Sequence, residues 1–252
     1  MKALITGGSS GIGKDMAIYL KKLGHEVIIV GSNKERLDKV SNKLNCKSIV
    51  MDLGSIDNCK KLYEMVKNEN IDILINNAGF GKFGEFIDID LDEELNMIDV
   101  NINAVHILTK LFLKDFVKRD SGYILNVASS AAFEPGPLMA TYYSTKAYVL
   151  RLTTSIYEEL RRNKSNVHVS VLCPGPVKTN FNNVANVKFD IKSISSDYCA
   201  EYAIKKMFKN KLIIIPSFYM KAGIFFTRFI PTKMMARIAY NIQSKKRWFY
   251  LF

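Results

Sequence analysis

Short apolar runs alternate with amphipathic segments along most of the chain. Segments with helical spacing lie between the apolar runs, at about 14–22, 34–44, 55–68, 91–119, 142–163 and 197–209. The apolar runs predict seven buried strands, at 2–6, 26–30, 47–51, 71–76, 122–128, 167–172 and 211–216. Strands rich in Val, Ile and Leu that alternate with helices are typical of a parallel sheet covered on both faces. Right-handed crossovers then predict a doubly wound Rossmann fold of class α/β.

The pattern also predicts how the chain is divided. No linker interrupts residues 1–216, so we expect one dinucleotide-binding and catalytic domain. Residues 176–196 are polar and irregular, and a loop of this length usually serves a site, so we expect it to cover a substrate. Residues 217–252 form a C-terminal extension with two predicted helices, at 222–230 and 234–242.

Composition narrows the class of protein. The 252 residues are 48% hydrophobic and 24% charged, as in ordinary globular domains. No apolar run approaches the length of a membrane-spanning helix, and the first residues do not resemble a signal peptide. The four cysteines form no CxxC pair and the three histidines are scattered, so we expect no disulfide framework, no metal site and a reducing, cytoplasmic location.

The segment TGGSSGIG, residues 6–13, joins the first predicted strand to the first helix. Its glycines let the backbone turn tightly and approach a pyrophosphate, and the helix start offers free N–H groups. The lysine of a P-loop is missing. A plain connection is the alternative, but the position at the start of a parallel sheet favours cofactor binding. The predicted contacts are Gly7, Ser9, Ser10, Gly11, Ile12 and Gly13.

Later polar residues follow the ends of other strands, where ligands bind in this fold class. Asp52, with Leu53, could accept from an adenine amine or cap the next helix. The stretch NNAG, residues 76–79, could let a cofactor approach or form only a turn. From it we predict contacts by Asn77, Ala78 and Gly79.

The end of the second strand selects between the two nicotinamide cofactors. An acidic side chain there binds the ribose 2′-OH of NAD and repels the 2′-phosphate of NADP. Here Ser32 and Asn33 follow the strand instead, with Lys34 and Arg36 near. We therefore predict NADP(H) as the preferred cofactor with NAD(H) as the alternative, although Glu35 weighs against this preference.

Candidate chemistry gathers between the fifth strand and the following helix. Ser129 precedes Tyr142 by 13 residues, and Lys146 follows Tyr142 by four. Residues i and i+4 share a helix face, so Tyr142 and Lys146 point into one cleft. Tyr143 points about 100° away and would be a packing or substrate-wall residue.

Together, TGxxxGIG, NNAG, the upstream serine and YxxxK resemble the short-chain dehydrogenase/reductase family over residues 1 to about 216. Residues 129–148 further resemble its DltE-like bacterial subgroup. The resemblance implies that Tyr142 is the general acid/base, with Lys146 lowering its pKa and holding the nicotinamide ribose. Ser129, or Ser130 if the loop is one residue shorter, would polarise the substrate carbonyl. Asn101, or its neighbour Asn103, would hold a water of a proton relay.

The segment PGPVKT, residues 174–179, matches the stretch that lines the nicotinamide in this family, or is a proline-rich strand exit. The predicted contacts are Pro174, Gly175, Val177 and Thr179, together with Tyr142 and Lys146. We also expect a homo-oligomer, a dimer or tetramer.

The C-terminal extension is basic and aromatic. The whole chain has a net charge of +12, and residues 218–252 carry seven Lys/Arg and no Asp or Glu. Met235, Ile238, Ala239 and Ile242 would share an apolar face of the second helix. That face could pack on the body or a sister subunit, or bind an anionic membrane surface together with the aromatic end around Trp248. We expect no nucleic-acid partner, because no such motif appears.

These features predict an NAD(P)-dependent oxidoreductase acting on a ketone or secondary alcohol. One alternative is a non-catalytic dinucleotide sensor or scaffold, which would not need the Ser–Tyr–Lys set. Another is a membrane-associated reductase of a lipid-like ketone, 3-oxoacyl or steroid, with which Phe181, Val184 and Phe189 near the loop are compatible. An extended-type epimerase would need a longer substrate region.

Overall fold

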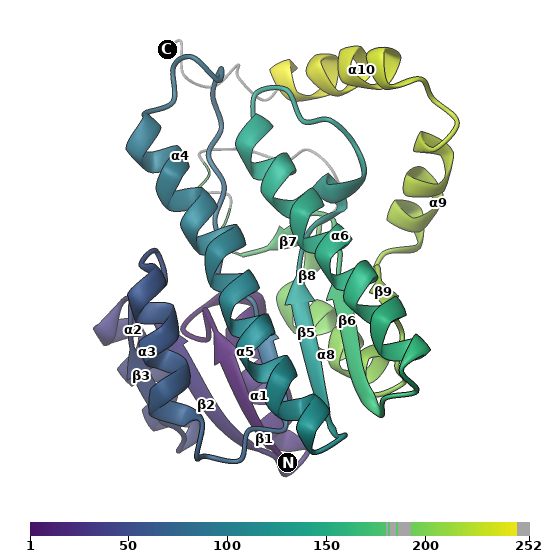
Figure 1. Ribbon diagram of the computed structural model, residues 1–252. Helices are drawn as coiled ribbons and strands as arrows, with labels where there is room; N and C mark the ends of the chain where they lie inside the picture. The colour runs from purple at the N-terminus through teal and green to yellow at the C-terminus, as the bar shows by residue number, and fades with distance from the viewer. Residues whose placement is uncertain (180, 182–184, 186–192, 246–252) are drawn as a thin grey trace.

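A computed structural model describes residues 1–179, 181, 185 and 193–245. Its centre is a seven-stranded parallel sheet in the order β3-β2-β1-β4-β5-β6-β9 (Figure 1). The strands are β1 (Lys2–Thr6), β2 (Glu26–Gly31), β3 (Lys47–Val50), β4 (Ile73–Asn76), β5 (Gly122–Val127), β6 (Val167–Leu172) and β9 (Ile213–Ile214). The predicted doubly wound Rossmann fold is confirmed. Its strand order reverses between β1 and β4, where such folds bind their ligands.

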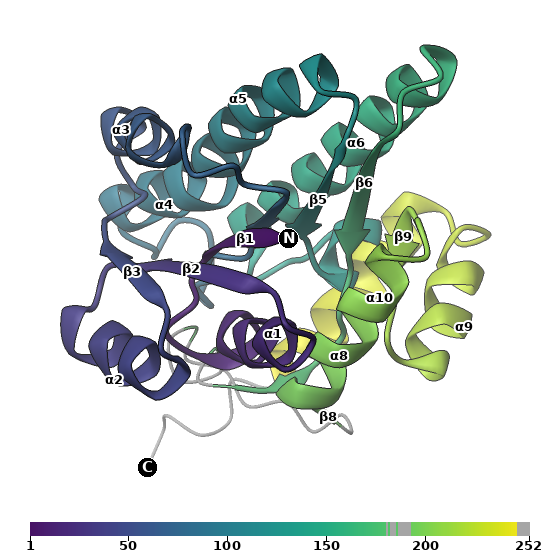
Figure 2. The same ribbon diagram turned by 90° about the horizontal axis from the view of Figure 1, so that it is seen from below.

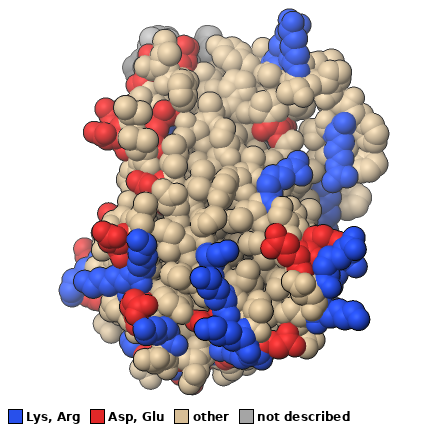
Figure 3. Space-filling model, in the orientation of Figure 1, with Lys and Arg blue, Asp and Glu red and all other residues tan. Residues whose placement is uncertain are grey.

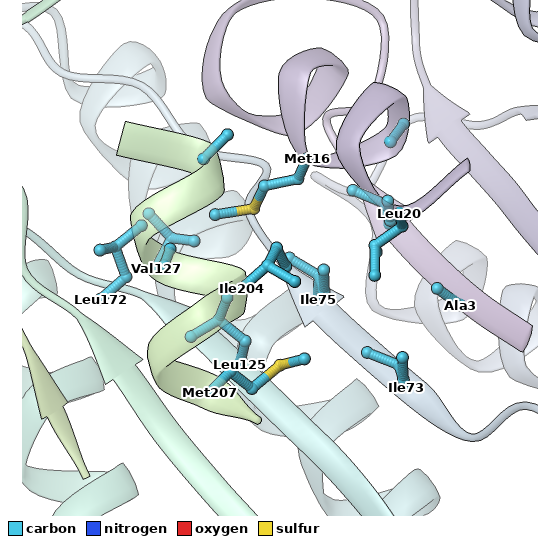
Figure 4. Packing of buried hydrophobic residues seen from close by; sticks show 14 of the residues in the cluster. Ala3, Met16, Leu20, Ile73, Ile75, Leu125, Val127, Leu172, Ile204 and Met207 are labelled. Carbon is cyan, nitrogen blue, oxygen red and sulfur yellow. The ribbon is translucent and has the colours of Figure 1, made fainter. Parts of the chain in front are cut away.

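Helices cover both faces of the sheet (Figure 2). One face carries α1 (Gly11–Lys22), α2 (Lys34–Leu44) and α8 (Ser196–Met207). The other carries α3 (Ile56–Val66), α4 (Leu91–Ile98), α5 (Ala104–Lys118) and α6 (Ala140–Arg162). Because side chains alternate along a strand, Ala3 and Ile5 pack toward α1 and α8, whereas Leu4 packs with the opposite layer. Figure 4 shows the first of these layers, where Met16 and Leu20 of α1 meet Ile204 and Met207 of α8.

Four predicted elements differ clearly from the structure. The predicted helix 91–119 is interrupted by a π-helical turn, η1 (Asp99–Asn103), between α4 and α5. The predicted strand 211–216 shortens to β9. The predicted helices of the extension are α9 (Phe218–Thr227) and α10 (Thr232–Ser244). On α10, Met235 and Ala239 are buried as expected, but Ile242 is 50% exposed and Gln243 takes its place on the buried face.

The ends of the predicted substrate loop are tied together. Strand β7 (Val177–Lys178) pairs in parallel with β8 (Ile194–Ser195). Val184 and Phe189 of that loop, and Trp248 of the extension, lie outside the described residues. Within the described ranges, no helix has the length and apolarity to cross a bilayer, and His, Cys, Asp and Glu side chains form no group able to hold a metal.

Candidate active site

A cavity of about 590 Å³ lies at the carboxyl edge of the sheet and collects residues from most of the predicted motifs. The predicted residues that line it are Gly7, Ser9, Ser10, Gly11, Ile12, Ser32, Asn33, Asp52, Leu53, Asn77, Ala78, Gly79, Ser129, Tyr142, Lys146, Pro174, Gly175, Val177 and Thr179. Two predicted residues, Gly13 and Asn101, do not line the cavity. The structure therefore brings together segments that are spread over most of the chain.

The glycine-rich turn has the backbone shape that its sequence requires. Gly7 and Gly11 have φ angles of +66° and +52°, in the left-handed region that favours glycine. A Cβ on Gly13 would lie 2.3 Å from Asn77 Nδ2 and 2.4 Å from the Gly7 carbonyl oxygen. Glycine at position 13 thus lets the turn and the end of β4 pack closely.

The first turn of α1 suits a phosphate group. Ser10 at its N-cap makes no side-chain capping bond, whereas Asn33 caps α2 and Ser55 caps α3. The N–H groups at the start of α1 are therefore left without a side-chain acceptor, beside the cavity. Because such groups and the helix dipole attract anions, this end of the cavity fits the pyrophosphate of a dinucleotide.

Asn77 ties the glycine turn to the end of β4. Its Nδ2 donates to the carbonyl oxygens of Thr6 and Gly7, at 3.0 and 3.2 Å. The Thr6 hydroxyl in turn accepts from the backbone N–H groups of Asn77 and Ala78. NNAG is therefore more than a turn, since it holds the first strand and the glycine turn in place.

Side chains after β2 point in different directions. Lys34 bonds Asp38 at 2.9 Å, and Glu35 bonds Lys39 at 2.7 Å, so both are engaged along α2. Asn33 Oδ1 accepts from the Arg36 N–H at 2.9 Å and caps the helix. Arg36 lines the cavity and forms no ion pair within the described residues. Its guanidinium, which the prediction only noted as near, is thus a cation without an ion-pair partner in the described part of the chain.

Asp52 also lines the cavity, but it does not cap the following helix. Its Oδ1 accepts from the Gly54 N–H at 3.0 Å in a local turn. Ser55 caps α3 by accepting from the Asn58 N–H at 3.3 Å. The alternative role of Asp52 as a helix cap is therefore wrong, and the adenine contact stays a prediction.

Ser129, Tyr142 and Lys146 meet at the other end of the cavity. The exposed fractions of Tyr142 and Lys146 are only 8% and 4%. Lys146 Nζ donates to the Val127 carbonyl oxygen at 3.0 Å and lies 5.8 Å from the centre of the Tyr142 ring. The Tyr142 hydroxyl hydrogen-bonds Ser129, whose Oγ also accepts from the Ala131 N–H at 3.1 Å. The latter bond fixes Ser129 at the start of η2 (Ser130–Phe133).

Ser130 also lines the cavity, but its backbone N–H donates to the Pro174 carbonyl oxygen, and of the two serines it is Ser129 that hydrogen-bonds Tyr142. The geometry therefore favours Ser129 over Ser130 as the partner of Tyr142.

The expected lowering of the Tyr142 pKa is wrong. Burial raises the pKa of Tyr142 to about 12, although the hydrogen bond with Ser129 acts to lower it. Burial also lowers the pKa of Lys146 to about 8. Removal from water disfavours the charged form of each group, and this is the largest cause of both pKa shifts. At neutral pH the phenol therefore keeps its proton.

Asn101 is fully buried in the π-helical turn η1. Its Nδ2 donates to the Phe80 carbonyl oxygen at 2.9 Å and to Thr145 Oγ1 at 3.0 Å, and its Oδ1 accepts from the Phe80 N–H. A Cβ on Gly79 would lie 2.8 Å from Asn101 Oδ1 and 3.2 Å from Lys146 Nζ. Asn101 and Lys146 thus both lie next to Gly79.

Asn103, the alternative, is engaged elsewhere, since its Nδ2 donates to Asp99 Oδ1 at 2.6 Å. Turns of π-helix inside α-helices frequently occur at functional sites, and this one turns Asn101 toward α6.

The exit from β6 crosses the glycine turn and meets the extension. A Cβ on Gly11 would lie 3.2 Å from Thr179 Cγ2. A Cβ on Gly175 would lie 2.8 Å from Met220 Cγ of α9. Residues 174–179 therefore connect both ends of the cavity with the C-terminal extension.

Several cavity residues lay outside the sequence prediction. They are Gly31, Met51, Phe80, Asn96, Val100, Val127, Ala128, Ala131, Met139 and Pro176, whereas Arg36 and Phe181, which the prediction named without a defined contact, also line it. The Phe181 ring lies 5.4 Å from the Tyr142 ring, and a Cβ on Gly81 would touch Phe181, Tyr142 and Met139. Apolar residues at strand exits and in loops carry no sequence signal for a site. Tyr143 lines the cavity, as expected of a substrate-wall residue.

The sheet is doubly wound, its first helix has no side-chain cap, and Ser129, Tyr142 and Lys146 meet at its carboxyl edge. This is the architecture of a dinucleotide-dependent oxidoreductase. The family model described as short chain dehydrogenase matches residues 1–188, and the chain belongs to this family. The predicted family and the general class of oxidoreductase are confirmed. The DltE-like subgroup stays a prediction.

Two curated relatives and one solved structure illustrate the similarity. An uncharacterized oxidoreductase of Staphylococcus epidermidis is 34% identical over 181 residues, which cover 70% of this chain and 78% of the relative. The very-long-chain 3-oxoacyl-CoA reductase of Bos taurus is 35% identical over 180 residues, covering 68% of this chain and 57% of the relative. A short-chain dehydrogenase from Sphingobium yanoikuyae in complex with NADPH has a TM-score of 0.83 and 26% identity, covering 90% of this chain and 92% of that chain.

Proposed function

We propose that this protein is an NADP-preferring dehydrogenase/reductase that interconverts a ketone and a secondary alcohol. The observation that carries the proposal is the convergence of Ser129, Tyr142 and Lys146 on one cavity whose far end suits a dinucleotide phosphate. A sensor or scaffold on the same fold would need the phosphate end alone. The buried reacting group at the other end favours an enzyme.

In the proposed reduction, a bound nicotinamide supplies the hydride that adds to the carbonyl carbon. The Ser129 hydroxyl donates a hydrogen bond to the carbonyl oxygen and polarises it. Tyr142 then transfers its phenolic proton to that oxygen as negative charge develops there. A pKa of about 12 suits this acid role, because Tyr142 starts the reaction protonated at neutral pH.

Lys146 has two tasks in this proposal. Its ammonium lies near the Tyr142 ring and would stabilise the phenolate left after proton transfer. Its donors would hold the ribose next to the nicotinamide. Asn101 holds Phe80 and Thr145 around this point, and a water relay that returns the proton to Tyr142 would pass between Asn101 and Lys146.

Support for NADP comes from the end of β2. Ser32, the Asn33 amide and the unpaired Arg36 line the cavity there, and no acidic side chain does so immediately after the strand. A guanidinium binds a 2′-phosphate well, whereas Glu35 is paired with Lys39. NAD(H) remains the alternative cofactor.

For the substrate we propose an apolar ketone of the 3-oxoacyl or steroid kind. Phe80, Met139, Tyr143 and Phe181 form an aromatic and apolar wall around Tyr142. Such a wall would bury a hydrocarbon chain or ring system next to one polar carbonyl. The bovine relative, a 3-oxoacyl-CoA reductase by name, agrees with this substrate class.

A panel of ketones tests the proposal. The protein is incubated with NADPH or NADH and with 3-oxoacyl esters, steroid ketones and small water-soluble ketones, and nicotinamide absorbance is followed. We expect turnover with NADPH, fastest on an apolar ketone. Tight NADPH binding with no turnover on any ketone would favour the sensor instead.

We also propose that the chain forms a homo-oligomer. Leu91 and Leu95 on α4 are 66% and 48% exposed, and such apolar positions favour subunit contacts. Light scattering on the purified protein would give the number of subunits.

A further inference from the structure

The outer face of α9 is a surface of exposed aromatic rings. Phe218, Phe225 and Phe229 lie on one side of the helix, with spacings of seven and four residues, and are 77%, 53% and 72% exposed. Tyr219 and Phe226 lie beside them and are 82% and 64% exposed. We call these five residues the aromatic face.

The opposite side of α9 is also apolar and already has a partner. Ile224 is buried, and Met220 packs against Gly175 at the cavity. A helix that is hydrophobic all round is normally buried on all sides. The aromatic face therefore has the composition of a surface that needs a second partner.

The rings of the aromatic face support one another. The centre of the Phe225 ring lies 5.6 Å from that of Phe226 and 5.5 Å from that of Phe229, in edge-on contacts. Single exposed apolar residues are normal on protein surfaces, but a contiguous group marks an interaction site. The face is preformed rather than a set of scattered side chains.

Cations without a carboxylate partner among the described residues surround the aromatic face. One of them, Lys221, also donates to the Tyr202 hydroxyl at 3.1 Å. Lys221 and Arg228 flank it on the side of α9, and Lys233 and Arg237 are exposed on α10. None of them pairs with a carboxylate within the described residues, and residues 218–245 contain no Asp or Glu. Figure 3 shows basic side chains over α9 and α10, separated by uncharged atoms.

We propose that α9 and α10 dock on the surface of an anionic lipid bilayer. Aromatic rings favour the zone between headgroups and acyl chains, and Lys and Arg are attracted to anionic headgroups. A second copy of this chain fits the face less well. Two-fold pairing would place the same patch against itself, with cations opposite cations and no carboxylate to separate them.

The docking surface lies beside the candidate active site. α9 contacts Gly175 of the cavity through Met220, on the side opposite the aromatic face. An apolar ketone dissolved in the bilayer would thus have a short path to Tyr142. This consequence rests on the proposed function, whereas docking itself needs neither cofactor nor substrate.

Flotation of the full chain with lipid vesicles tests the proposal. Vesicles of phosphatidylcholine alone are compared with vesicles that also contain phosphatidylglycerol, without cofactor. We expect at least about tenfold stronger binding to the anionic vesicles, weakening as salt is raised. Equal binding to both vesicles, or binding to neither, would overturn the proposal.

Two pairs of variants locate the surface. Phe226→Ser/Phe229→Ser and Lys221→Glu/Arg228→Glu should each weaken binding by about tenfold or more. The matched controls change exposed residues elsewhere, Met65→Ser/Val117→Ser and Lys60→Glu/Lys61→Glu, and should change binding less than about twofold. Thermal melting shows whether each variant is folded. If Phe226→Ser/Phe229→Ser does not fold, the binding of Lys221→Glu/Arg228→Glu still decides the test.

Two further measurements separate the outcomes. If the aromatic-face variant dissociates an oligomer in light scattering and the vesicles do not bind, the occupant is a second copy and the proposal is wrong. NADPH consumption with a water-soluble ketone, measured without vesicles, should be unchanged in the aromatic-face variant. If the unaltered protein consumes no NADPH, this result would count against the proposed function, but it would not affect the proposal of lipid binding.

Discussion

At the scale of single residues, adjacent tyrosines of α6 have different contacts. The Tyr142 hydroxyl bonds Ser129, and its ring lies near Lys146 and Phe181. Tyr143 packs on Gly136, where a Cβ would lie 2.0 Å from the ring. Burial raises the pKa of both phenols, so only the contact with Ser129 and Lys146 distinguishes the proposed acid.

Replacing each tyrosine separately tests this distinction. Tyr142→Phe removes the transferable proton and should lower kcat at least about 100-fold, the usual contribution of general acid catalysis. Tyr143→Phe keeps the ring and should lower kcat less than about tenfold. NADPH binding by fluorescence should survive in both variants. The opposite ranking of the two rates would mean that Tyr143 is the acid.

A second residue-scale prediction concerns Arg36. Arg36→Ala removes the unpaired cation at the end of β2 and should raise the KM for NADPH about tenfold or more, while the KM for NADH changes little. Lys34→Ala is the matched control, because Lys34 is held by Asp38 and does not line the cavity. Equal effects of Arg36→Ala on both cofactors would contradict a role in phosphate recognition.

At the scale of elements, the glycine turn and the end of β4 act as one unit. Asn77 bonds Thr6 and Gly7, and Gly13 leaves the room for its amide. The spacing of the glycines was visible in the sequence as a cofactor motif. That Gly13 serves packing rather than contact with the cavity follows only from the position of Asn77.

Gly13→Ala should therefore weaken both stability and cofactor binding. Its Cβ would lie 2.3 Å from Asn77 Nδ2, and crowding of this kind costs about 1–3 kcal/mol of unfolding free energy. Gly223→Ala in α9 is the contrasting change. Beyond its own helix, no atom of the described residues lies within 4 Å of where the Cβ would be, and alanine favours a helix, so we expect a gain of about 0.5–1 kcal/mol. Urea unfolding measures both changes, and an unchanged Gly13→Ala midpoint would refute the packing role.

At the scale of the whole molecule, α10 rests on the fold through a short buried row of Met235, Ala239 and Gln243. Burial raises the pKa of Tyr143, and the Gln243 amide beside it acts to lower that pKa. Among the described residues, neither amide atom meets hydrogen-bond geometry with a partner, although the side chain is only 2% exposed. A buried amide without partners costs free energy.

Gln243→Met should accordingly stabilise the protein. Methionine keeps the volume and removes the unpaired polar atoms, so we expect about 1 kcal/mol of added stability, or about 2–4 °C in Tm. Gln243→Ala, which leaves a cavity, should instead destabilise the fold. Calorimetry compares the variants, and a lower Tm for Gln243→Met would show that the amide has a favourable partner.

Local features of the sequence were enough to predict the sheet, the glycine turn and the shared helix face of Tyr142 and Lys146. Strand and helix periods and the i, i+4 relation depend only on neighbouring residues, so they can be seen without a structure. The π-helical turn at Asn101 changes the helical register, and no local sequence pattern predicted it. The sequence pattern also did not predict that Arg36 rather than Lys34 would be left without an ion pair, because this depends on the pairs that Lys34 and Glu35 form along α2.

The sequence by itself thus determined the fold class, the family and the residue types of the reacting group. Only the tertiary structure decided that Ser129 rather than Ser130 bonds Tyr142, that the Tyr142 pKa rises and the Lys146 pKa falls, and that the rings of α9 stand exposed. The reason is physical. Burial, and with it the cost of a charge, depends on which distant segments pack together, and periodicity along the chain carries no information about that.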